Sequence, residues 1–209
     1  MRLYICGIKD FLDLNGTQFV TGSRLKRIHC FRQNTDKARA LVSGLLLRRF
    51  CGVVDDCDLI YGDNGKPYLK NNSMFFNISH SGDYVVLVTA DNETGVDIEI
   101  VKPFPESVAG RFFTPEENEY INAENTSEAF FRIWTAKESI MKGSGLGLSM
   151  SPESFSVLPM DSSAHVIDNR TWFLEWFSFN NHIICRSIEN KNEETEIIHC
   201  TKEMVLADT

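Results

Sequence analysis

The spacing of apolar residues predicts helices in several parts of the chain. The clearest helix follows Asn34 and Thr35, and its buried face has the i, i+3, i+4, i+7, i+8 spacing of Ala38, Leu41, Val42, Leu45 and Leu46. Asn34 or Thr35 can cap the start of this helix, and Gly52 is a stop signal. We also expect a basic helix over about 23–31, a helix that starts at Thr114-Pro115, and one over about 128–142 that ends at Gly143.

Alternating and continuous apolar runs predict strands on both sides of these last two helices. Strands are expected at 2–8, 74–79, 84–90, 95–101, 172–179, 183–188 and 196–200. Short turn-forming segments separate the three runs between 74 and 101, which favours an antiparallel meander.

The order of the expected elements indicates fold class and domain organisation. It reads β-α-α-βββ and then α-α-βββ, which predicts an α+β protein with two similar halves, residues 1–102 and 103–209. The Pro-containing segment 102–105 is the expected linker. No residue-level repeat relates the halves, so the duplication rests on element order alone.

Composition narrows the class of protein. The 209 residues are 43% apolar and 24% charged, ordinary globular values that exclude disorder and a coiled coil. No apolar stretch is long enough to span a bilayer, and the first ten residues lack the features of a signal peptide. Six scattered cysteines with no CxxC pair are typical of reduced thiols. We therefore expect a cytoplasmic protein that does not bind membranes.

The charge is unevenly distributed. The chain has 21 basic and 29 acidic residues, a net charge of −8, yet residues 21–50 hold eight basic residues against one acidic. A general nucleic-acid binder needs a broader cationic surface, so that class is disfavoured. One basic segment suits a compact polyanion or an acidic partner. The alternative is that these charges form ordinary solvated helix faces.

Two carboxylates share one face of a predicted strand. In the segment GVDIE, Asp97 and Glu99 point to the side opposite Val96 and Ile98. Two like charges side by side repel unless a cation lies between them, and Mg²⁺ prefers such oxygen ligands. A metal site and a half-exposed strand with a polar outer face both fit this pattern.

The helix at 128–142 and two earlier loops add candidate residues. Glu138 lies at the edge of the apolar stripe and can be a third oxygen ligand. The alternative is that Glu138 and Lys142, which have the spacing of an exposed helix pair, lie on the surface, and the same alternative holds for Lys137.

Ser79 and His80 end a strand on a cluster of donors that can bind an anion, and Lys66 follows a turn. The chain lacks the GxSxG elbow of a hydrolase, and its GSGLG segment follows a helix, unlike a Rossmann loop.

Together and in this order, five motifs resemble the Sfp-type 4'-phosphopantetheinyl transferases. They are GKP at 65–67, FNISHS at 76–81, GVDIE at 95–99, FFTPEE at 112–117 and WTAKESIMK at 134–142. The resemblance implies the fold of that family, two α+β halves related by a pseudo-twofold axis. It also implies transfer of phosphopantetheine from coenzyme A to a serine of an apo acyl or peptidyl carrier protein.

The same resemblance implies roles for individual residues. Asp97, Glu99 and Glu138 would bind Mg²⁺, and Glu138 would also activate the serine. Lys137 and Lys142 would lie near the pyrophosphate, with Lys142 the better candidate to stabilise or protonate the leaving group. The residues implied to bind coenzyme A phosphates are Arg24, Arg27, Lys66, Ser79 and His80, together with those two lysines. Arginine at 24 and 27 departs from the lysine that is frequent in the family, and Lys26 is an alternative.

Two other classes of function are alternatives to this transferase. The first is a catalytically silent relative that only binds carrier protein or coenzyme A. Such a relative would be expected to lack one of the acidic ligands or the second helix lysine, but this chain has all three acidic residues and Lys142. An unrelated Mg²⁺-dependent nucleotide enzyme would leave the order of the motifs unexplained. Two fused halves make a monomer sufficient for activity.

Overall fold

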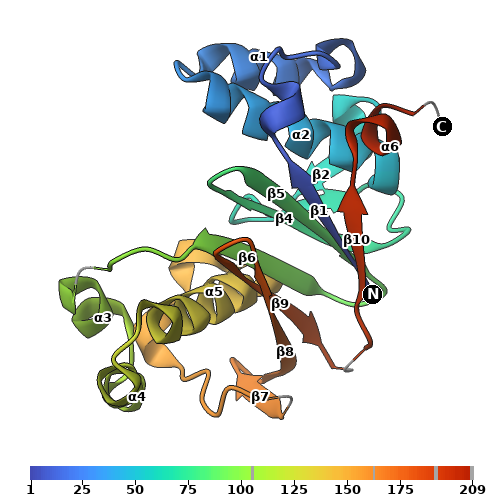
Figure 1. The fold of residues 1–209 in the computed structure, drawn as a ribbon. Helices are drawn as coiled ribbons and strands as arrows, with labels where there is room; N and C mark the ends of the chain where they lie inside the picture. The colour runs from blue at the N-terminus through green and yellow to red at the C-terminus, as the bar shows by residue number, and fades with distance from the viewer. Residues whose placement is uncertain (105, 162, 191–192, 208–209) are drawn as a thin grey trace. The chain divides into compact units, whose positions relative to one another are not determined.

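The computed structural model describes residues 1–104, 106–161, 163–190 and 193–207. The chain forms two compact units (Figure 1). Unit 1 consists of Met1–Asp91 together with Glu194–Thr209, and unit 2 consists of Asn92–Glu193. The α+β class is confirmed, because each unit combines a four-stranded sheet with helices packed on it.

Unit 1 is built on a sheet in the order β10-β1-β5-β4. Its strands are β1 (Arg2–Gly7), β4 (Phe75–Ser81), β5 (Tyr84–Ala90) and β10 (Glu196–Cys200). The long helix α2 (Asn34–Cys51) packs on this sheet and buries Leu41, Leu45 and Leu46 in the core. A short pair, β2 (Leu59–Tyr61) and β3 (Pro67–Leu69), forms a separate small sheet.

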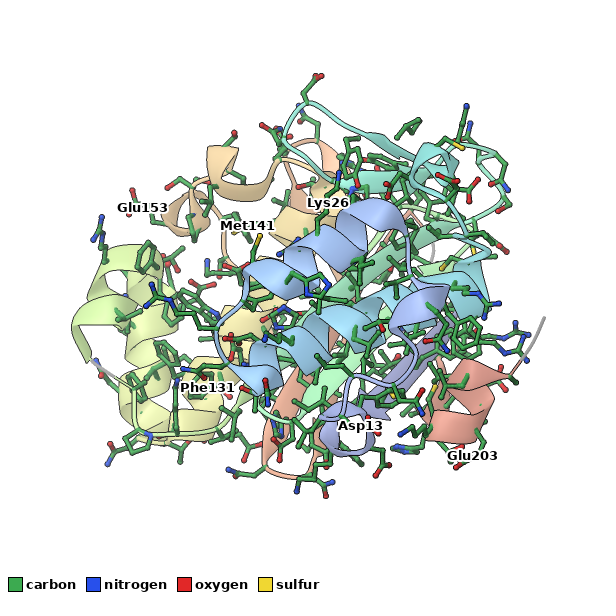
Figure 2. All side chains as sticks on the ribbon, turned by 90° about the horizontal axis from the view of Figure 1, so that it is seen from above. Asp13, Lys26, Phe131, Met141, Glu153 and Glu203 are labelled. Atoms are coloured by element: carbon green, nitrogen blue, oxygen red, sulfur yellow. The ribbon has the colours of Figure 1, made fainter. Side chains whose placement is uncertain are left out.

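Two further helices of unit 1 pack against α2. Helix α1 (Gly22–Cys30) begins at Thr21, whose side chain accepts a hydrogen bond from the backbone of Arg24, and Figure 2 shows α1 with Lys26 beside α2. Helix α6 (Lys202–Leu206) follows β10. Helix α2 ends at Gly52 in the left-handed region (φ 71°), as expected, but Gln33 precedes its first residue, so neither Asn34 nor Thr35 is the cap.

Unit 2 contains an antiparallel sheet in the order β6-β9-β8-β7. Its strands are β6 (Thr94–Ile100), β7 (Ala164–Ile167), β8 (Arg170–Phe179) and β9 (His182–Glu189). Helix α5 (Ser127–Ser144) lies along one face of this sheet and contacts β6 and β9 (Figure 1). Two shorter helices precede it, α3 (Glu106–Phe112) and α4 (Pro115–Glu124). Single 3₁₀ turns at Lys9–Phe11, Thr17–Phe19, Asp56–Asp58, Gly147–Ser149 and Pro152–Ser154 complete the two units.

The unit border differs from the predicted border at residue 102. Strand β6 does not continue a meander from β5; it pairs with β9, which places residues 92–102 in unit 2. Strand β10 pairs in parallel with β1, so the C-terminal segment belongs to unit 1 rather than to the second half. The expected linker is irregular over 101–104 but lies inside unit 2, and its residue Pro105 is outside the described residues.

The structure bears on two features noted in the sequence, the lack of a membrane-spanning stretch and the scattered cysteines. None of the helices in the described part of the chain has both the length and the apolar character that a membrane crossing needs. Three of the six cysteines, Cys6, Cys51 and Cys185, are buried as free thiols.

Candidate active site

Strand β6 presents its two carboxylates toward α5. Val96 and Ile98 are fully buried on the opposite face, while Gly95, Asp97 and Glu99 share the face that α5 covers. Asp97 is buried and Glu99 is half-buried. The alternation predicted from the sequence therefore places both carboxylates at the contact between one strand and one helix.

Gly95 allows α5 to approach β6 closely. A Cβ atom at Gly95 would collide with the carbonyl oxygen of Ser139 and lie 2.6 Å from the nitrogen of Gly143. Gly143 is therefore a packing residue and not the end of the helix, which comes at Gly145 (φ 74°). Because the backbones touch here, the side chains two residues further along β6 meet those on the last turn of α5.

Gly95→Ala should strongly destabilise the protein, because neither backbone can retreat without breaking the sheet or the helix. We expect a loss of about 3 kcal/mol, the upper part of the range for overpacking, measured by urea unfolding. The matched control is Gly110→Ala in α3, where an added Cβ meets nothing within 4 Å and alanine should be neutral or stabilising by up to about 1 kcal/mol. Equal urea midpoints for the two variants would contradict the close contact.

Lys142 connects the helix to the strand. Its Nζ donates a hydrogen bond to Oδ1 of Asp97 at 2.5 Å, and the two side chains are 31% and 3% exposed. A charged carboxylate as buried as Asp97 needs a counter-charge, which this lysine supplies. Besides its interaction with Glu138 on the same helix, Lys142 therefore forms an ion pair that joins α5 to β6.

The pKa values of Glu138 and Lys142 are both raised at this contact. Burial raises the pKa of Glu138, and the nearby Asp97 raises it further, while Lys142 acts in the opposite direction. Burial would lower the pKa of Lys142, but its interactions with Asp97, Glu138 and Glu99 outweigh that effect and raise it. Three acidic side chains and one lysine therefore form one electrostatic cluster on β6 and α5.

The oxygen atoms of this cluster are of the type that binds a hard divalent cation. Their arrangement in the structure is not that of a metal site. Carboxylate oxygens are the ligands that Mg²⁺ prefers. In the described part of the chain, however, no trio of His, Cys, Asp or Glu side chains is arranged to hold a metal ion. The ammonium of Lys142 already binds Asp97 where a cation would be expected.

Lys137 lies apart from this cluster. Its side chain is only 2% exposed, and its Nζ pairs with Oε2 of Glu117 at 2.8 Å. It also donates hydrogen bonds to the carbonyl oxygens of Pro152 (2.7 Å) and Phe155 (2.5 Å). These three partners use all three donors of an ammonium group. The contacts of Lys137 support a structural role and give no support to its predicted role in catalysis and phosphate binding.

Glu117, which the sequence presented as the last residue of the FFTPEE motif, is the ion-pair partner of Lys137. It completes a capping box with Thr114 at the start of α4. Its second oxygen accepts a hydrogen bond from the backbone of Val157 at 2.9 Å, and the whole side chain is buried. Its ion-pair partner Lys137 lies 20 positions later and on another helix, so no local pattern in the sequence reveals this buried ion pair.

Glu117→Gln should destabilise the protein by about 3–5 kcal/mol, because it leaves the ammonium of Lys137 buried without a counter-charge. Urea unfolding measures the loss, and Glu116→Gln, an exposed change one residue earlier, should cost at most about 1 kcal/mol. Adding Lys137→Met to Glu117→Gln should restore much of the lost stability. A double variant no more stable than the single one would show that the unpaired charge is not the cause.

In unit 1 the structure brings two predicted arginines together. Arg24 and Arg27 line a cavity of about 170 Å³ whose other walls include Ser23, Leu59 and Tyr61. Burial lowers the pKa of Arg24, and the positive charge of Arg27 lowers it further. Two cations held this close favour a bound anion, so the pair fits the predicted phosphate contact. Tyr61, which sequence reasoning did not select, is part of the same cavity.

The other predicted residues of unit 1 are spread over two elements. Lys66 is buried just before β3, with its Nζ 5.1 Å from the centre of the Tyr68 ring. Ser79 and His80 are neighbours in β4, so their side chains point to opposite faces of the strand. Ser79 is buried and His80 is exposed. A single ligand cannot meet both side chains on the same face of β4.

Comparison with known proteins agrees with this picture. A family model described as 4'-phosphopantetheinyl transferase superfamily matches residues 93–196, and one described as 4'-phosphopantetheinyl transferase, N-terminal, matches 14–92. The border between the two matches falls beside the border between the units after Asp91.

Named relatives point the same way. Two 4'-phosphopantetheinyl transferases of Bacillus subtilis, one of them named Sfp, are 33% and 32% identical to this chain, with 66% of each chain covered. One of Bacillus pumilus is 33% identical over 75% of this chain and 74% of its own. One of Salmonella typhi is 36% identical over 54% and 62%. The match thus spans about two thirds of the length of the Bacillus subtilis relatives. The chain belongs to the 4'-phosphopantetheinyl transferase superfamily, and within it to the Sfp type.

Proposed function

We propose that this protein transfers the 4'-phosphopantetheine group from coenzyme A to a serine of an apo acyl or peptidyl carrier protein, which converts the carrier to its holo form. The observation that carries the proposal is the electrostatic cluster of Asp97, Glu99, Glu138 and Lys142 on β6 and α5. The names of the relatives support the reaction class.

The proposed reaction forms one phosphorus–oxygen bond and breaks another. The serine oxygen attacks the β-phosphorus of the coenzyme A diphosphate, and the bond from that phosphorus to the bridging oxygen breaks. Adenosine 3',5'-bisphosphate leaves with the bridging oxygen. The serine proton moves to a base, and the leaving group needs neutralisation or a proton. Such a reaction depends mainly on positioning and charge stabilisation.

Each member of the cluster has a part in this scheme. Asp97, Glu99 and Glu138 would hold Mg²⁺, which when bound supplies positive charge to the diphosphate oxygens. Glu138 is also proposed to accept the serine proton, directly or through water. Lys142 neutralises the charge that develops on the bridging oxygen. Lys137 is assigned instead to holding α5 against the Glu117 and Phe155 segments.

The cationic residues of unit 1 are proposed to bind the phosphates of coenzyme A. Arg24 and Arg27 are the best supported, since they share a cavity. Lys66 and either Ser79 or His80 are further candidates. Exposed cations of the 21–50 segment, such as Lys26 and Arg32, would attract an acidic carrier protein. We further propose that the protein acts as a cytoplasmic monomer without nucleic-acid or membrane partners.

The test is to incubate the protein with coenzyme A, Mg²⁺ and apo carrier proteins of the fatty-acid, polyketide and peptide types, and to measure intact carrier masses. At least one carrier should gain the mass of a single phosphopantetheine, and a chelator should prevent the gain. Carriers that all stay unmodified, while still binding the protein, would favour the catalytically silent alternative.

A further inference from the structure

We propose that Lys142 is the resident cation of the carboxylate cluster, and that a divalent ion enters only by displacing the lysine ammonium from Asp97. The inference rests on the proposed function for the identity of the ion and of the diphosphate ligand. It concerns the order of binding at this site, which the proposed reaction leaves open.

The contacts of Lys142 support this role. Its Nζ lies 2.5 Å from Oδ1 of Asp97, a buried carboxylate at the contact between α5 and β6. The same ammonium interacts electrostatically with Glu138 and Glu99, the two other proposed ligands. One positive charge therefore faces three carboxylates that the divalent ion would use.

A divalent ion and this ammonium compete for the same charges. Mg²⁺ binds oxygen at about 2.0–2.1 Å and needs near-octahedral ligands. Two cations held on one buried carboxylate repel each other strongly, because little water screens them.

The lysine can leave, because it is on the accessible side of the ion pair. Its side chain is 31% exposed, whereas that of Asp97 is 3% exposed. A lysine has a long flexible stem and a compact charge, so it can swing to a new anion without moving α5. A bound diphosphate is such an anion. Metal binding should therefore be weak in the free protein and much stronger once a diphosphate has drawn Lys142 away.

The first experiment measures Mn²⁺ binding to the full-length protein without coenzyme A, from the EPR signal of free Mn²⁺. Lys142→Met should bind Mn²⁺ roughly tenfold more tightly than wild type, because the competing charge is gone. Lys142→Arg keeps the cation and should bind as weakly as wild type. The control is Lys102→Met, an exposed lysine of the same unit whose loss changes the net charge equally. An affinity for Lys142→Met within about twofold of Lys102→Met would overturn the proposal.

A second measurement needs no folded variant. In wild-type protein, saturating Mn²⁺ should release the ammonium of Lys142 from Asp97 and raise its reaction with an amine-acylating reagent several-fold, as read by peptide mass spectrometry, while Lys102 stays constant. An unchanged or reduced rate at Lys142 would contradict displacement. Neither readout depends on transfer, so a failure here with normal carrier modification rejects the lysine role alone. Unmodified carriers reject the proposed function instead.

Discussion

Replacing Glu138 by glutamine should lower the rate of phosphopantetheine transfer about a thousandfold. The change removes both a proposed metal ligand and the proposed base for the serine proton, and loss of a general base alone typically costs 10²- to 10⁴-fold. Glutamine keeps the size of the side chain and is a good helix former, so α5 should stay folded. Glu138 is half-buried, and an amide has nearly the shape of the carboxylate that it replaces.

The measurement is the single-turnover rate of carrier modification, with intact mass as the readout. Glu128→Gln is the matched control, since it removes the same charge from an exposed position in the first turn of the same helix. It should change the rate by less than about twofold. If Glu138→Gln retained a rate near that of the control, Glu138 would be neither a ligand nor a base.

Asp97→Asn should have an effect of similar size, about a hundred- to a thousandfold on turnover, for a different reason. The amide removes the negative charge that holds Lys142 in the free protein and that would face the metal. Asparagine fits the space of aspartate, and Lys142 can turn to water or to Glu138. We therefore expect the unfolding free energy to fall by no more than about 2 kcal/mol.

Thermal melting checks the fold, and the same single-turnover assay gives the rate. The control is Asp168→Asn, an exposed turn residue of unit 2 with a positive φ that asparagine adopts readily. Excess Mg²⁺ should recover part of the Asp97→Asn activity, because a weakened site fills at higher concentration. A large loss that is independent of Mg²⁺ concentration would mean that Asp97 acts on catalysis without holding the metal.

Local patterns in the sequence were sufficient for the parts of the site that lie within one element. The alternation around Asp97 placed both carboxylates on one face of β6, and the Thr114-Pro115 pair predicted the start of α4. The four-residue spacing of Glu138 and Lys142 put both on one side of α5. Such signals depend only on the strand and helix periods, which neighbouring residues determine.

Long-range pairing was beyond the reach of these patterns. Strand β6 looks like the third strand of a meander, yet it pairs with β9, which begins 88 residues after β6 begins, and β10 pairs with β1. Nothing near β6 or β10 in the sequence specifies those partners. The border between the compact units therefore falls after Asp91, whereas the predicted halves were divided after residue 102; the α+β class itself is confirmed.

The contacts of Lys137 were likewise not predictable from local sequence patterns. It precedes Glu138 in a motif typical of an active site, which favoured a phosphate contact. Adjacent helix residues are about 100° apart around the axis, so Lys137 and Glu138 point in different directions from α5. The ammonium of Lys137 contacts Glu117 and two backbone carbonyl oxygens. A charged residue inside a functional motif can therefore stabilise the fold beneath the site.

The most direct test of the proposed site is the position of the metal itself. We expect crystals of the protein grown with coenzyme A and Mn²⁺ to give an anomalous peak about 2 Å from carboxylate oxygens of Asp97, Glu99 and Glu138, with diphosphate oxygens completing its ligands. A Mn²⁺ peak bound by other residues, with these three carboxylates left out of its coordination, would contradict the assignment.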